Sequence, residues 1–313
     1  MKNKIIFNIV LISLIFIVCE LCAYFYITIH RYGHVTPYFP NKIDILKSTG
    51  YYPLNKFKKF ERNENNTKLP ILLLGCSYTY GELLEEDKDF SEKLGTQSGR
   101  HIYNMGMSGQ GPMAGLTLLE IEEKNKTIDK EPEYIIYTYM FQHIQRWCWW
   151  RYYNEYRKHN FIPFQKYNYF DNSYLVSYFR NRQVDNYFYN DETLEKRKKL
   201  LLDMINAMHL QSKKLYPNSK FILHLYSDIN KDLCYDLAMD EENEKYFTLL
   251  YSKQFKKEIE SLGITVVSTE ELIGRKMDKI KDRIPSELDV NHPHPSEFAW
   301  DEIVPKLVKK FNF

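Results

Sequence analysis

Short apolar runs that alternate with longer stretches of helical periodicity constrain the fold of this chain most. The apolar runs are Pro70 to Leu74, Ile102 to Met105, Tyr134 to Met140, Phe221 to Tyr226 and Ile264 to Val267. The helical stretches are Met113 to Lys124, Leu194 to Leu215, Glu241 to Leu262 and Ser296 to Phe311. Five strands joined by long crossovers predict a three-layer α/β/α fold with a mostly parallel five-stranded sheet. Ligands of such sheets bind beyond the carboxyl ends of the strands, where we look for chemistry.

The amino terminus carries a second topological signal. Lys2 and Lys4 precede a 25-residue apolar stretch from Ile5 to Ile29, which is long enough to cross a bilayer with some tilt. A cleaved signal peptide is the alternative. The two lysines before the stretch, against Arg31 behind it, favour a cytoplasmic amino terminus. We therefore expect one transmembrane helix that anchors an extracytoplasmic body.

The chain is expected to have three parts. Residues 1–31 form the membrane anchor, residues 32–69 a linker, and residues 70–313 the α/β domain. An aromatic-rich insertion at 147–189 could form a lid or stacking wall for a glycan or acyl chain. A satellite hydrophobic cluster or a membrane-facing patch is the alternative.

Charge and cysteine content exclude two classes of protein. Lys and Arg total 43 and Asp and Glu total 41, a net charge of +2, so nothing attracts a nucleic acid to the chain as a whole. The five cysteines are an odd number and two lie in the apolar amino terminus, which argues against a disulfide framework.

One serine follows the first predicted strand directly. The strand ILLL runs into GCSYTYG, so Gly75 makes the turn and Ser77 falls at the carboxyl end of the strand. A serine in this place can act as a nucleophile. It can equally be the N-cap of a following helix.

An acid and a base stand near the other end of the chain. Asp289 and His292 are three residues apart, just before the last predicted helix. The carboxylate could hold the imidazole in one tautomer, and the imidazole could take the proton of Ser77. His294 breaks the three-residue relation to Asp289, so His292 is favoured as the base. Polar caps for the last helix are the alternative interpretation of this segment.

Glycines follow the second predicted strand in YNMGMSGQGP, at Gly106, Gly109 and Gly111. Without side chains in the way, backbone N–H groups here could hold the negative oxygen of a tetrahedral intermediate. A tight strand-to-helix turn explains the glycines as well. A phosphate-binding loop is disfavoured, because no Gly-Lys-Ser/Thr ending follows.

Three of these segments resemble sequence blocks of the SGNH (GDSL-like) hydrolases. GCSYTYGELL resembles the first block with Cys76 in the place of the aspartate, YNMGMSGQGP the second, and DVNHP the last. The resemblance implies a flavodoxin-like fold, Ser77 as nucleophile, His292 as base and Asp289 as its orienting acid. It also implies an oxyanion hole from the N–H groups of Ser77 and Gly109, and no metal or organic cofactor.

The third block departs from the family pattern. Gly-x-Asn-Asp is usual there, and this chain has MFQHIQR. Gln142, or alternatively His143, would have to supply the third oxyanion donor, since an amide or imidazole N–H can do so. A buried structural role for His143 is the other interpretation.

The resemblance implies a serine esterase that acts on an acylated small molecule or glycan. With the body outside the membrane, O-acyl esters of envelope glycans are the favoured substrates. An O-acyltransferase would use the same triad. A non-catalytic envelope protein that binds a glycan or a partner is the alternative from another class.

Overall fold

The computed structural model describes part of the chain, and all structural statements concern that part. The described residues are 8, 10–22, 68–81, 84–107, 111–140, 143, 194–226, 252–277, 280–282, 284 and 294–313. The chain divides into two compact units, one made of Met1–Tyr52 with Cys148–Glu192 and the other of Pro53–Trp147 with Thr193–Phe313. The second unit contains the sheet.

The sheet has five strands, all parallel, in the order β2-β1-β3-β4-β5. Their bounds are Ile71–Gly75 for β1, Ile102–Gly106 for β2, Tyr134–Met140 for β3, Lys220–Tyr226 for β4 and Thr265–Ser268 for β5. The parallel five-stranded sheet predicted from the sequence is thereby confirmed. The order is that of flavodoxin-like folds, in which the chain changes direction between β1 and β3.

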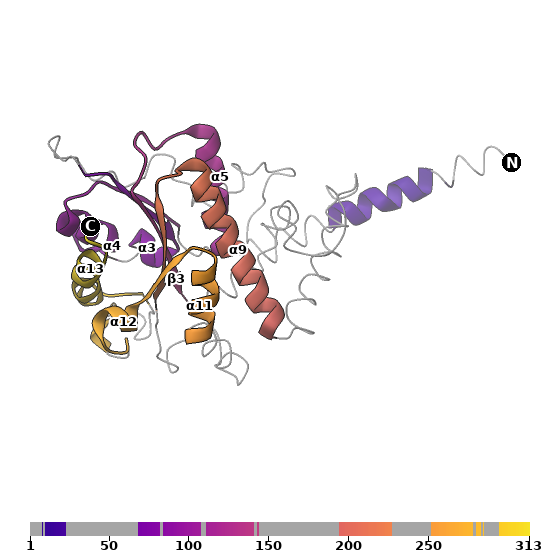
Figure 1. The fold of residues 1–313 in the computed structure, drawn as a ribbon. Coiled ribbons are helices and arrows are strands. Elements are labelled where there is room, and N and C mark those ends of the chain that lie inside the picture. Colours follow the sequence, from indigo (N-terminus) through magenta and orange to yellow (C-terminus); the bar gives the residue numbers. More distant parts are fainter. Residues whose placement is uncertain are drawn as a thin grey trace. The chain divides into compact units, whose positions relative to one another are not determined.

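Two layers of helices cover the sheet (Figure 1). One layer holds α5 (Pro112–Asn125), α9 (Leu194–Leu215) and α11 (Lys253–Ser261). The other holds α3 (Ser77–Tyr80), α4 (Phe90–Ser98), α12 (Thr269–Ile273) and α13 (Glu297–Phe311), with the short 3₁₀ turns η1 (Glu86–Lys88) and η5 (Ile280–Asp282). This division follows from right-handed crossovers, because the step from β1 to β2 runs opposite to the later steps.

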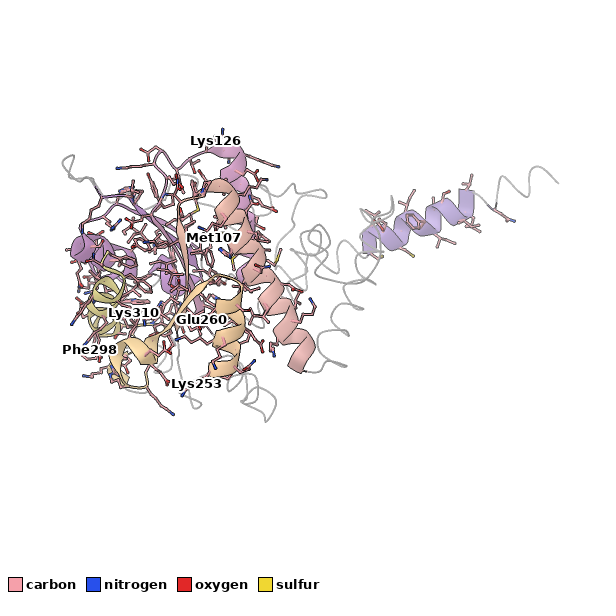
Figure 2. The ribbon with its side chains drawn as sticks, in the orientation of Figure 1. Met107, Lys126, Lys253, Glu260, Phe298 and Lys310 are labelled. Carbon is pink, nitrogen blue, oxygen red and sulfur yellow. The ribbon has the colours of Figure 1, made fainter. Side chains whose placement is uncertain are left out.

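Alternate residues of each strand enter opposite cores. Ile71 and Leu73 of β1 lie in one core with Phe90 and Trp300, whose rings stack 4.5 Å apart between α4 and α13. Because both faces are covered, the strands read as uninterrupted apolar runs, and this is why the sequence revealed them. In Figure 2, Met107 lies among interior side chains, whereas Lys126 projects at the end of α5.

Helices α11 and α4 differ from the sequence prediction, which also did not include the short helices α3 and α12. The helix expected from Glu241 to Leu262 begins in the structure at Lys253, because the side chain of Ser252 caps it by accepting from Phe255 N. Residues 241–251 lie outside the described residues. Helix α4 was not predicted, since its nine residues, FSEKLGTQS, contain a glycine and show little apolar periodicity.

Of the first unit, the structure describes a helix at residues 10–22. Its apolar side chains are exposed within that unit, among them Ile12 and Leu14. Within the described ranges no helix has the length and apolar character needed to cross a membrane.

Candidate active site

Gly75 shapes the turn that presents Ser77. Its φ of +154° lies in a region that side chains rarely adopt. A Cβ there would overlap Thr79 Oγ1 and lie 3.1 Å from the carbonyl oxygen of Thr138. Only glycine therefore allows β1 to turn into α3 this tightly, next to β3.

Ser77 is the first residue of α3, and Cys76 is the N-cap. The interpretation of Ser77 as a helix N-cap is therefore wrong. Cys76 points into the core, where its Sγ donates to Met140 Sδ at 3.4 Å. The Ser77 side chain lies at the carboxyl end of β1, at the change of chain direction, and the residue is only 3% exposed. Ligands of such sheets bind at this point.

The end of β2 is tied to the Ser77 turn. Met107 N donates to the carbonyl oxygen of Gly75 at 3.0 Å, and Asn104 Nδ2 donates to that of Thr79 at 2.8 Å. A Cβ on Gly106 would come within 2.5 Å of Tyr80 N, so β2 approaches α3 too closely for any side chain. Gly109, the predicted oxyanion-hole residue, lies outside the described residues.

His143 lies just beyond the end of β3 and is fully buried. Its Nδ1 is 2.9 Å from Tyr137 Oη, and its ring meets that of Tyr139 edge-on at 5.3 Å. A buried structural role was one of its two sequence interpretations, and the phenol of Tyr137 is one partner of the ring. Gln142 lies outside the described residues.

The carboxyl-terminal block comes to the Ser77 turn through His294. Its ring lies 5.1 Å from the ring of Tyr78, which also meets Tyr226 edge-on at 5.2 Å. The N-cap of α13 is Ser296, whose Oγ accepts from Ala299 N. Polar capping of that helix therefore does not explain Asp289 and His292, which themselves lie outside the described residues.

Sequence reasoning missed a buried series of polar side-chain contacts across the sheet. His224 of β4 lies 3.1 Å from Thr269 Oγ1 and 3.5 Å from Thr138 Oγ1, through its two ring nitrogens. Burial lowers the pKa of His224 to about 4, so the ring is neutral at pH 7. Thr138 is the register partner of Gly75, so these polar contacts lie beside the Ser77 turn. The signal for them was a lone histidine inside the apolar run FILHLY.

Among the described side chains, no group of three or more histidine, cysteine or acidic residues could hold a metal ion. The residues described around the Ser77 turn offer hydroxyl, imidazole and backbone N–H groups for chemistry.

No protein-family model matches the sequence, and no curated protein matches it either. Solved structures of similar shape do exist. A member of the lipolytic G-D-S-L family from Veillonella parvula is 12% identical, with a TM-score of 0.47 over 78% of this chain and 99% of that one. Est24, a carbohydrate acetylesterase from Sinorhizobium meliloti, is 11% identical, with a TM-score of 0.47 over the same shares of the two chains. The inhibitor-bound aryl esterase of M. smegmatis is 11% identical, with a TM-score of 0.48 and the same coverage.

Proposed function

We propose that this protein is a serine esterase that hydrolyses O-acyl esters. The observation that carries the proposal is the placement of Ser77 on a glycine-dependent turn at the carboxyl end of β1, where the sheet changes direction. The carboxyl-terminal block supports it independently, because His294 lies against Tyr78, the residue after Ser77.

The proposed base is close to this contact along the chain. Two residues of backbone reach about 7 Å at most, and His292 is two residues from His294. This limit is compatible with a hydrogen bond between the His292 imidazole and Ser77 Oγ. Asp289, three residues earlier, would orient the imidazole.

In this mechanism Ser77 Oγ attacks the carbonyl carbon of the ester while His292 accepts the hydroxyl proton. The backbone N–H groups of Ser77 and Gly109, with Gln142, stabilise the oxyanion by about 3 kcal/mol per donor. The carbon–oxygen bond of the ester then breaks, and His292 returns the proton to the leaving alcohol. Water attacks the acyl-serine in the same manner and releases the acid, whereas a sugar hydroxyl in its place would give acyl transfer.

Labelling with a fluorophosphonate tests this proposal. The probe should attach to Ser77 in the full chain, and Ser77→Ala should abolish both labelling and turnover of a small acetyl ester. Ser212→Ala is a matched control, because Ser212 is equally buried but lies in α9, where its Oγ donates to Met208 O at 2.7 Å. A wild-type protein that is inert to the probe and to every ester would contradict the proposal and favour the binding protein.

The proposed substrates, O-acyl groups of envelope glycans, depend on where the body lies. Lys2 and Lys4 before the apolar stretch support an anchor with the body outside the cytoplasm. The protein should then stay with membranes after a salt wash and be open to protease from the outer side of oriented vesicles. Recovery of a mature form that begins beyond residue 22 would instead indicate a cleaved signal peptide.

A further inference from the structure

A cluster of three charged side chains holds the segment before α13. The guanidinium of Arg275 donates from its two Nη atoms to the two carboxylate oxygens of Asp282, at 2.8 and 2.6 Å. It also donates to Glu302 of α13, from Nε at 3.1 Å and from Nη2 at 2.5 Å. Asp282 is 1% exposed, so this is a fork-like pair on a buried carboxylate rather than a surface ion pair.

Asp282 also belongs to two short segments that hydrogen-bond to each other. We call this pair the neck: Asp282 and Ile284 lie in one segment, and His294 and Ser296 in the other. The carbonyl oxygen of Asp282 accepts from Ser296 N at 2.9 Å, and Ile284 N donates to the carbonyl oxygen of His294 at 3.0 Å. These two bonds join the ends of the segment between positions 284 and 294. That segment contains Asp289 and His292.

The neck contacts the proposed nucleophile turn through His294. The ring of His294 lies against that of Tyr78, next to Ser77, and both residues are buried. Arg275 is therefore linked to the Ser77 turn by two successive sets of contacts, from Asp282 to the neck and from the neck to Tyr78. Within the described part of the chain its hydrogen bonds go to Asp282, Glu302 and the carbonyl oxygen of Lys276 rather than to the turn, so its role is one of positioning.

We propose that Arg275, with Asp282 and Glu302, is the positioning group of the esterase reaction, which fixes the neck and so sets His292 against Ser77. The inference rests on the proposed function of Ser77 and His292. Base and nucleophile come from distant segments of the chain, and a misplacement of about 1 Å can lower a rate a hundredfold. A positioning group between them must be rigid, and a planar guanidinium with two carboxylates in fixed directions is rigid in a way that an ammonium is not.

Arg275→Lys tests this, because it keeps the charge and loses the fork. We expect kcat for an acetyl ester and the rate of fluorophosphonate labelling to fall about ten- to a hundredfold, with KM changed less than about threefold. Arg100→Lys is the matched control. Arg100 is buried and pairs with Glu133 at 2.7 Å and with the carbonyl oxygen of Leu69 at 2.6 Å, but both partners precede strands, at the opposite end of the sheet from Ser77.

Both variants are measured at a temperature where circular dichroism shows each to be folded. Loss of rate in Arg275→Lys but not in Arg100→Lys supports the inference. Equal rates in the two variants, with wild-type protein labelled at Ser77, overturn the inference and leave the proposed function standing. A wild-type protein that is not labelled at Ser77 overturns the proposed function, and the inference with it.

Discussion

His294 and Tyr78 contact each other through their rings, whose centroids lie 5.1 Å apart with an angle of 57° between the ring planes. One ring comes from the segment before the last helix and the other from the turn after the first strand. The sequence motifs only suggested that these two regions belong together. The contact between the two rings shows that they do.

The contact separates the roles of two neighbouring histidines. His292→Ala should lower esterase turnover about 10⁴-fold or more, because the proposed base is lost. His294→Ala removes one aromatic contact and should lower the free energy of unfolding by about 1 kcal/mol, with a far smaller loss of turnover. Steady-state kinetics and urea unfolding measure both. A severe loss in His294→Ala with an active His292→Ala would move the base to His294.

The turn at Gly75 is expected to tolerate no side chain. Gly75→Ala should lower the free energy of unfolding by at least about 3 kcal/mol, since the Cβ overlaps Thr79 Oγ1 and the φ of +154° is strained. Gly99→Ala is the control, with a φ of +64° but no atom within 4 Å of the added Cβ, and should lose about 1 kcal/mol. Urea denaturation compares the two variants. Equal losses of unfolding free energy would show that the overlap at Gly75 is relieved without an energetic cost.

The block after β3 offers two donors with different expected behaviour. Gln142→Ala should fold normally and lower turnover by roughly ten- to a thousandfold, as when one oxyanion donor is removed. His143→Ala should lower the free energy of unfolding by about 2 kcal/mol, because His143 is fully buried and pairs with Tyr137 Oη. Tyr137→Phe removes the same hydrogen bond and keeps the ring. A neutral Gln142→Ala with a well-folded, inactive His143→Ala would assign the donor to His143.

His224 makes stability depend on pH. Its pKa is about 4 in the folded protein because of burial, and about 6.5 in an unfolded chain. The unfolded state therefore binds the proton more tightly than the folded state. The contribution of neutral His224 to the free energy of unfolding is fully present above pH 6.5 and is lost as the pH falls towards 4. The total loss is about 3 kcal/mol. His224→Gln should flatten the pH dependence of urea unfolding in this window. The same slope in wild type and variant would exclude His224 as its source.

The sheet was predictable because its strands are buried on both faces and read as apolar runs between amphipathic helices. The turn at Ser77 was predictable in outline because only Gly75 fits it. The Arg275 cluster was not, since Arg275, Asp282 and Glu302 come from separate segments and resemble ordinary surface charges until the fold brings them together. Helix α4 was missed because a short helix with Gly95 inside it has no clear apolar stripe.

The tight approach of β1 and β2 to α3 has a consequence for directed evolution of this protein. Randomised codons at Gly75, Cys76 or Gly106 would mostly yield misfolded variants, because two of these backbones exclude a Cβ and Cys76 lies in the core. Met107 is a position that a library can vary with less risk, although its side chain is buried as well. Its backbone N–H holds the Gly75 carbonyl whatever its side chain, and methionine sites accept replacement more readily than most.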